Sequence, residues 1–155
     1  MIGIFIAQNA LRYPGSRGFI GRKVLKELKK TTLISLFQTL TDWGLKPKVH
    51  YKYNPSDSTV SFWNGSIIDL LELRDRPEDP EFQRFGSFEF TFGAIDEVGE
   101  VSQKAKDVLF SRIRFLLDEF KITAKLLMSC NPGKNFTYSE FYKPHRDGYL
   151  PKNKV

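Results

Sequence analysis

The sequence has very few residues that could form covalent cross-links or bind a transition metal. It contains one cysteine, Cys130, and two histidines, His50 and His145, among 155 residues. A single cysteine cannot form an internal disulfide, and a structural zinc site of the cysteine and histidine type is not expected. No sequence motif places a histidine beside Cys130 as a base, so we interpret this residue as a small buried side chain rather than a nucleophile.

Long hydrophobic stretches and targeting signals are also missing. No apolar run approaches the roughly 18 residues that suggest a membrane-spanning helix, so no membrane partner is expected. Residues 1–7 are apolar, but they lack a basic leading segment and are not followed by a small-residue cleavage site. This pattern argues against a secretory signal and predicts that the chain is not secreted.

Positive charge is in excess, with 24 lysines and arginines against 18 acidic residues and a formal net charge of +6. Such a balance permits an anionic partner such as DNA, RNA or a nucleotide. The most basic segment is residues 12–30, in which Glu27 is the one acidic residue. It forms either a solvated face or a surface that faces phosphate groups, and in the second case Arg17, Arg22 and Lys23 are the candidate DNA- or phosphate-facing residues.

Length and patterning predict one domain of the α/β class with a mainly parallel sheet flanked by helices. Stretches typical of strands are residues 19–22, 49–53, 58–63, 66–70, 88–95 and 125–129. Stretches typical of helices are residues 32–44, 102–113 and 137–142, and the tail from residue 143 is expected to be loop-like. The pair Asn64 and Gly65 predicts an antiparallel hairpin excursion on the sheet. Residues 2–10 fit either a helix or a strand.

The most informative pattern is an apolar run, residues 90–95, that ends in two adjacent carboxylates, Asp96 and Glu97. In parallel sheets, ligands bind beyond the carboxyl ends of the strands. This is the pattern of a Walker B element, in which Asp96 would hold Mg²⁺ and Glu97 would orient and activate the attacking water. The alternative is that both acids are surface or helix-capping residues at the end of a strand.

A second apolar strand, residues 126–128, ends in the polar residues Ser129, Cys130 and Asn131 and runs into a predicted turn at Pro132. Ser129 or Asn131 could hydrogen-bond a phosphate or the attacking water, although a plain strand-to-turn junction explains the same pattern. If the first interpretation holds, Asp96 and Ser129 lie at the same edge of one sheet, on neighbouring strands.

Two further observations bear on a nucleotide site. Arg112 and Arg114 are predicted on different sides of a helix, where one of them could sense a phosphate in its own site or a neighbour's. The phosphate-binding loop Gly-x-x-x-x-Gly-Lys-Ser/Thr is missing from the 155 residues. The segment from Gly15 to Gly21 is rich in glycine but is followed by Arg22 and Lys23, and this sequence does not cradle a triphosphate.

Taken together, three segments in order resemble the ATPase domain of the phage terminase large subunit, the DNA-packaging motor. Residues 12–23 resemble the end of the helix after the phosphate loop and the next strand. Residues 96–114 resemble the Walker B region, and residues 129–144 resemble the coupling motif and the segment beyond it. The resemblance also implies that residues 2–12 form a helix.

The resemblance implies a role for each candidate residue. Asp96 would be the Mg²⁺ ligand, Glu97 the catalytic carboxylate, and Ser129, Cys130 and Asn131 the coupling motif. The implied ligands are ATP and Mg²⁺, and the implied partners are double-stranded DNA, other terminase subunits and the portal, in the cytoplasm of the infected bacterial host. Since the phosphate loop is expected before residue 1 and a nuclease domain after residue 155, residues 1–155 are expected to form a single partial ATPase domain that is inactive alone.

Two other functions remain open from the sequence. One is a non-catalytic, basic, aromatic-rich nucleic-acid-binding module, which would need exposed rings for base stacking. Exposure of Phe88, Phe90 and Phe92 would favour that module, and their burial would remove its main support. The other is a fragment of a helicase-like ATPase, in which an Asp-Glu pair and a polar coupling strand also occur.

Overall fold

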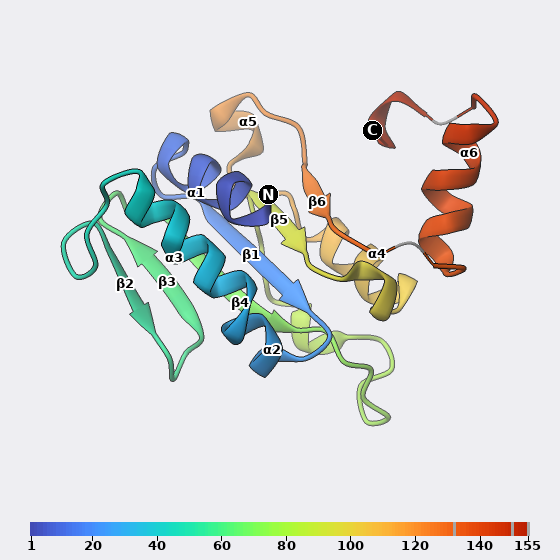
Figure 1. Cartoon of the computed structure of the whole chain (residues 1–155), viewed down its shortest axis with the longest axis horizontal. Coiled ribbons are helices and arrows are strands. Elements are labelled where there is room, and N and C mark those ends of the chain that lie inside the picture. The colour runs from blue at the N-terminus through green and yellow to red at the C-terminus, as the bar shows by residue number, and fades with distance from the viewer. Residues whose placement is uncertain (132, 150, 155) are drawn as a thin grey trace.

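The computed structural model describes residues 1–131, 133–149 and 151–154, so the predicted turn at Pro132 lies outside the described residues. Its centre is a six-stranded sheet in the order β2-β3-β4-β1-β5-β6 (Figure 1). The four strands from β4 to β6 in that order are parallel, and β3 is antiparallel to both β2 and β4. The strands are β1 (Arg17–Arg22), β2 (Tyr51–Asn54), β3 (Thr59–Phe62), β4 (Ile67–Glu72), β5 (Phe92–Ile95) and β6 (Leu126–Met128). The predicted α/β fold with its antiparallel excursion is confirmed.

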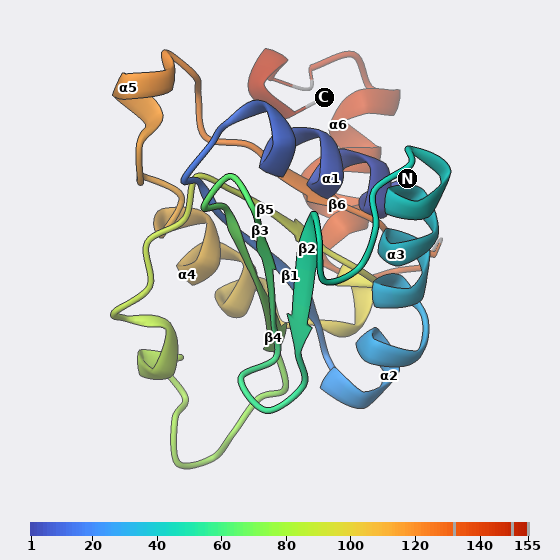
Figure 2. The same cartoon turned by 90° about the vertical axis from the view of Figure 1, so that its left-hand side faces the viewer.

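Helices cover both faces of the sheet. The longer ones are α1 (Ile2–Arg12), α2 (Leu25–Lys30), α3 (Thr32–Asp42) and α4 (Gln103–Ser111). Figure 2 shows α1, α2 and α3 on one face and α4 on the other. The shorter ones are α5 (Leu117–Phe120), α6 (Lys143–Arg146), η1 (Gln83–Phe85), η2 (Val98–Glu100), η3 (Tyr138–Tyr142) and η4 (Lys152–Lys154). The segment that fitted either a helix or a strand is the helix α1, as the resemblance implied.

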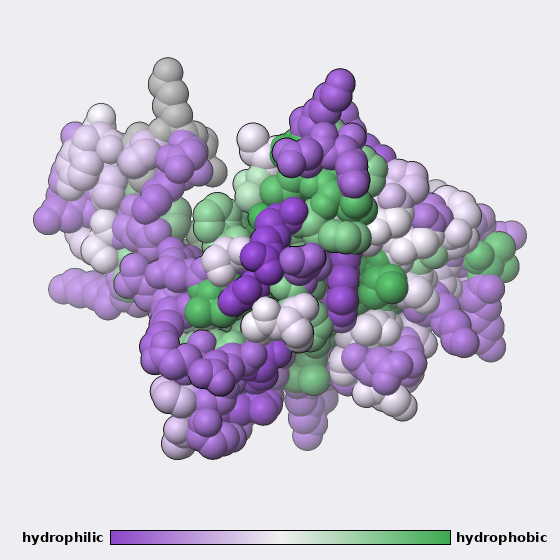
Figure 3. Space-filling model, turned by 180° about the vertical axis from the view of Figure 1, so that it is seen from behind, coloured by the Kyte–Doolittle hydropathy of each residue, from purple (hydrophilic) through white to green (hydrophobic). Residues whose placement is uncertain are grey.

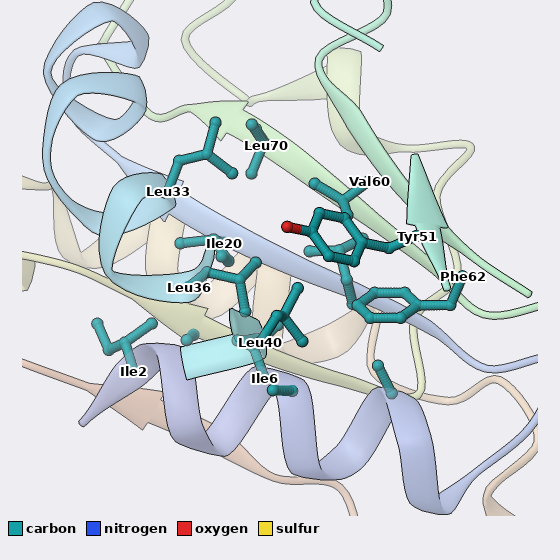
Figure 4. Packing of buried hydrophobic residues seen from close by; sticks show 14 of the residues in the cluster. Ile2, Ile6, Ile20, Leu33, Leu36, Leu40, Tyr51, Val60, Phe62 and Leu70 are labelled. Atoms are coloured by element: carbon teal, nitrogen blue, oxygen red, sulfur yellow. The ribbon is translucent and has the colours of Figure 1, made fainter. Parts of the chain in front are cut away.

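The face under α1 and α3 is filled mainly by aliphatic side chains. Leu33, Leu36 and Leu40 recur at helical spacing along α3 and are almost fully buried. They belong to one cluster with Ile20 of β1 and Leu70 of β4, between the helix and the sheet (Figure 4). Burial of each such side chain contributes roughly 1.5–3 kcal/mol, so this face fixes the position of α3 on the sheet.

The opposite face is packed with aromatic rings. Phe19 of β1 and Phe90 are fully buried, with ring centroids 4.7 Å apart. Phe19 also lies over Gly93, its register partner on β5, where a Cβ atom would overlap the ring. Ala105 and Leu109, one turn apart on α4, close this cluster from outside. The absence of a side chain at Gly93 therefore leaves space for the ring of Phe19, which packs across β1 and β5.

The predicted hairpin is confirmed, with a three-residue loop between Phe62 and Ser66. The Phe62 amide donates to the Ser66 carbonyl at 2.9 Å, and Gly65 takes the left-handed conformation with φ 85°. Asn64 does not share that conformation; its side-chain amide instead donates to the carbonyl of Ala10 at 2.8 Å. The turn is thus tied to the end of α1, which sequence alone did not indicate.

Several local predictions are wrong because tertiary contacts override the local pattern. The strand expected from residue 88 begins only at Phe92, since Phe90 forms an isolated bridge with Ile113. Ile113 consequently lies outside α4, which ends at Ser111. Strand β6 is only half-buried because it is an edge strand. The tail from residue 143 is not a loop at its start but the helix α6.

The carboxyl-terminal segment is attached to α4 through a charged cluster. The ammonium group of Lys106, whose side chain is only 7% exposed, lies 2.8 Å from both carboxylate oxygens of Glu140, and Lys154 donates to Glu140 at 2.9 Å. Burial alone would raise the pKa of Glu140, but the hydrogen bonds from both lysines outweigh burial and lower it. An ionised Glu140 therefore stabilises the attachment of this segment to α4.

Hydrophilic side chains cover most of the face seen in Figure 3, and hydrophobic surface gathers near its middle. Within the described ranges, no helix has both the length and the apolar character needed to cross a membrane.

Candidate functional site

The centre of the candidate site is Asp96, the residue that follows β5 at the carboxyl edge of the sheet. Ser129, which follows β6, donates a hydrogen bond from its hydroxyl to Asp96 Oδ1 at 2.6 Å. Since β5 and β6 are parallel neighbours, the predicted placement of these two residues at one edge is confirmed. The backbone amide of Asp96 is fixed by the carbonyl of Gly21 at 2.8 Å.

Glu97 turns away from Asp96 because its backbone adopts a left-handed conformation, with φ 52° and ψ 48°. This conformation is unfavourable for a non-glycine residue by roughly 1–2 kcal/mol. The Glu97 amide donates to Ser129 Oγ at 3.2 Å, and the side-chain amide of Asn131 donates to both carboxylate oxygens at 3.3 and 3.1 Å. The two adjacent carboxylates therefore have different partners.

The predicted coupling residues lie next to this pair of acids. Ser129 contacts both acids, and Asn131 contacts Glu97. Cys130 is exposed, which corrects the expectation of a buried residue, and its sulfur lies 3.9 Å from the Thr137 hydroxyl. After β6, the side chains of Ser129 and Asn131 thus point toward the two acids, and that of Cys130 points toward the segment around Thr137.

Two residues of the basic amino-terminal region complete the surroundings of Asp96. Arg22, the last residue of β1, places Nη1 3.3 Å from Asp96 Oδ2, and Thr32, the first residue of α3, donates its hydroxyl to the same oxygen. Thr32 was not predicted as a site residue; the sequence showed it only as a candidate helix start. Its role follows from the packing of α3, which brings this helix start to the end of β5.

Other candidate residues lie elsewhere. Arg17, at the start of β1, forms a two-pronged ion pair with Asp69 at 2.7 and 3.1 Å and is at the amino edge of the sheet. Arg112 and Arg114 flank the bridge with Phe90, also at the amino edge, because Phe90 precedes β5 whereas Asp96 follows it.

The prediction that the two arginines sit on different sides of a helix is wrong. Arg112 caps the end of α4, and Arg114 lies beyond it in an exposed ion pair with Glu89 at 2.9 Å. Within this chain, neither is brought to Asp96. Lys23 is exposed directly after Arg22 at the carboxyl edge.

The residues around Asp96 fit a magnesium ion. The metal ligands that the site offers are oxygen atoms, from the Asp96 carboxylate and the hydroxyls of Thr32 and Ser129, and Mg²⁺ prefers such hard ligands. The guanidinium of Arg22 contacts the same carboxylate. Among the described residues there is no group of three or more histidine, cysteine or acidic side chains that could hold a metal. Mg²⁺ is commonly bound by one or two carboxylates together with substrate phosphates and water.

Helix orientation makes the same edge attractive to anions. Helix α1 precedes β1 and therefore starts at the carboxyl edge, and α3 starts beside Asp96. Both helices have eleven residues, and the start of such a helix carries a partial positive charge and free backbone amides. In α/β folds of this kind, ligands bind beyond the carboxyl ends of the parallel strands, which is where Asp96, Glu97 and the two helix starts lie.

The comparisons with solved structures identify the fold more closely. The large terminase of a thermophilic bacteriophage matches with a TM-score of 0.72 and 16% identity over 95% of this chain, and the complex of the same terminase with ADP matches with 0.71 and 17% over 97%. The ATPase domain of the Thermus phage P74-26 large terminase matches with 0.56 and 14% over 90%. The chain thus has the fold of phage large terminases, which confirms the predicted resemblance at the level of the fold.

The match covers only part of each of these solved structures. This chain spans about a third of the length of the thermophilic-phage terminase chains, at 34% and 35%, and 57% of the P74-26 domain. No family model and no curated protein matches the sequence.

Proposed function

We propose that this chain is part of a viral DNA-packaging motor, the portion of a terminase ATPase domain that carries the Walker B acids and the coupling motif. The motor would couple ATP hydrolysis to translocation of double-stranded DNA into a capsid. The observation that carries the proposal is the contact of Asp96 with Ser129 at the carboxyl edge of a terminase-like sheet. The thermophilic-phage terminase solved with ADP supports a nucleotide as the ligand.

Each site residue then has a task. Asp96 would hold Mg²⁺, which supplies charge neutralisation for the phosphates of ATP. Glu97 would orient and deprotonate the attacking water, and Asn131 holds its carboxylate in place. Ser129 contacts both Asp96 and Glu97. A change in the positions of these acids when the phosphates change would therefore shift Ser129 and, with it, Cys130 and Asn131. The starts of α1 and α3 would add favourable potential for the phosphates.

The proposal extends to partners and location. Residues 1–155 would form a single partial ATPase domain that works with double-stranded DNA, other terminase subunits and the portal in the cytoplasm of the infected bacterium. Arg112 and Arg114 lie away from Asp96, so any phosphate-sensing role would be toward a neighbouring subunit. The nucleic-acid-module alternative loses its main support, because Phe90 and Phe92 are buried and Phe88 is half-buried.

The test supplies the phosphate loop that the sequence lacks. The 155-residue chain should release no phosphate from ATP above background, because its sequence has no phosphate-loop motif to cradle the triphosphate. A fusion that places a terminase phosphate-loop segment before residue 1 should hydrolyse ATP. In that fusion Glu97→Gln should lower the rate by roughly 10²–10⁴-fold with nucleotide binding retained, the usual effect of losing a general base. Asp96→Ala should weaken Mg²⁺-dependent nucleotide binding as well.

Glu100→Gln is the matched control, since Glu100 is an exposed acid three residues beyond Glu97. It should leave the rate of the fusion unchanged. Robust hydrolysis by the unfused chain, or full activity of the fusion carrying Glu97→Gln, would overturn the proposal.

A further inference from the structure

Arg22 is held at the edge of the sheet by weak and incomplete contacts. Its Nη1 donates to Thr31 Oγ1 at 2.9 Å and to Asp96 Oδ2 at 3.3 Å, while its Nε lies 3.7 Å from the Glu27 carboxylate. That Nε is buried and has no hydrogen-bond partner among the described residues. A guanidinium group has five N–H donors, so most of the capacity of Arg22 is unused in this arrangement.

The contacts of Asp96 differ in charge. Ser129 donates to Oδ1, and Thr32 and Arg22 share Oδ2. The two hydroxyl groups are neutral and can rotate to present a lone pair to a cation, whereas a guanidinium stays charged at any ordinary pH. Of the described groups that contact Asp96, Arg22 is thus the one that repels an arriving cation.

We infer that Arg22 is a positioning residue that neutralises Asp96 in the cation-free protein and must be displaced when a divalent cation binds there. The inference rests on the proposed function, since it concerns the same carboxylate. The structure also offers a destination for the displaced side chain. The guanidinium already lies near Glu27 through Nε and donates to Thr31 through Nη1, and a short movement toward Glu27 would shorten the 3.7 Å separation and open Oδ2.

This arrangement has a functional consequence. As long as Arg22 occupies Oδ2, a free divalent cation gains little by binding Asp96 alone. A cation that arrives bound to phosphate groups already has oxygen ligands. The negative charge of those phosphates can also pair with the displaced guanidinium of Arg22. Arg22 would thus favour the cation–nucleotide pair over the bare cation.

The test measures binding of Mn²⁺ alone to the 155-residue chain, from the loss of the free-ion electron paramagnetic resonance signal. Arg22→Gln, which keeps length and polarity but removes the charge, should bind Mn²⁺ about tenfold more tightly than the unaltered chain, because a repelling charge close to the ligand oxygen is gone. Asp96→Asn should abolish this binding in both backgrounds. A loss of folding cannot produce a gain in affinity that depends on Asp96, so the readout separates positioning from stability.

Lys52→Gln is the matched control, since Lys52 is an exposed residue of β2, the edge strand away from β5, and its replacement removes the same charge. It should change the Mn²⁺ affinity less than about twofold, because a solvated charge away from the ligand oxygen is screened. Equal or weaker binding in the Arg22→Gln variant, with binding still lost in Asp96→Asn, would overturn the role of Arg22 and leave the proposed cation site standing. Mn²⁺ binding that is absent from every variant or indifferent to Asp96→Asn would overturn the cation site and the inference together.

Discussion

The hydroxyl group of Ser129 bridges the two acids of the candidate site, since it donates to Asp96 Oδ1 at 2.6 Å and accepts from the amide of Glu97 at 3.2 Å. Glu97 reaches this position only through a left-handed backbone. A single hydroxyl from the end of β6 therefore helps to hold a strained junction at the end of β5, and strain of this kind persists where surrounding contacts determine the conformation.

Removal of that hydroxyl should destabilise the protein. Ser129→Ala leaves Oδ1 of Asp96 and the amide of Glu97 each without its donor or acceptor, at an expected cost of about 1–3 kcal/mol in the free energy of unfolding. Urea denaturation of both chains measures the difference. Ser56→Ala, at an exposed position between β2 and β3, is the control and should be neutral within about 0.5 kcal/mol. A Ser129→Ala variant as stable as the control would contradict the bridging role.

Packing at Gly93 leads to a second prediction. Gly93→Ala should destabilise the fold by about 1–3 kcal/mol, because the added methyl group overlaps the buried ring of Phe19. The measurement is the thermal unfolding midpoint. Phe19→Leu alone should also be destabilising, but the double variant should be less destabilised than the sum of the two. Strict additivity of the two changes would show that the ring and the glycine do not compete for the same space.

The basic segment should bind duplex DNA weakly and without sequence preference. Phosphate neutralisation releases counterions, so the logarithm of the affinity should fall with the logarithm of salt, with a slope of about −0.9 per phosphate contacted. Arg17 is engaged with Asp69, so the exposed lysines Lys23, Lys26 and Lys30 are expected to carry the contacts.

Their joint replacement by glutamine should reduce the slope, as fluorescence titrations at several salt concentrations would show. Replacement of Lys46, Lys48 and Lys52 removes the same charge from another region and should reduce it less. Binding that is absent at low salt, or that does not respond to salt, would count against a DNA-facing surface.

Acid should weaken the attachment of the carboxyl-terminal segment. Glu140 has a lowered pKa in the folded protein, so its contribution is complete above the unfolded-state value of about 4.3 and is lost as the pH falls through the lower folded value. Stability should therefore decline below about pH 4. In Glu140→Gln this part of the pH dependence should disappear, and stability at neutral pH should drop because the buried Lys106 keeps only the exposed Asp107 as a carboxylate partner. Thermal unfolding from acid to neutral pH tests both; an identical pH profile in the variant would refute the role of Glu140.

The sequence by itself was enough to predict the class of the fold and the position of Asp96 and Glu97 at the end of a buried strand. Alternation of apolar strands with amphipathic helices is a local property, so β1, α3 and the hairpin around Gly65 could all be predicted. The order of Asp96 and Glu97 after a buried strand was equally visible, because parallel strands place their carboxyl ends at a common edge.

Tertiary structure decided what surrounds those acids. Arg22, Thr32 and Ser129 lie between 33 and 74 residues from Asp96 in sequence, and no periodicity links them. The packing of α3 on the sheet brings Thr32 to Asp96, and the sheet order β1-β5-β6 brings Arg22 and Ser129 to its two sides. Arg112 and Arg114 lie at the opposite edge, since their backbones pair with Phe90, which precedes β5, whereas Asp96 follows that strand. Local pattern sets which elements form, but the neighbours of a charged group depend on how those elements pack.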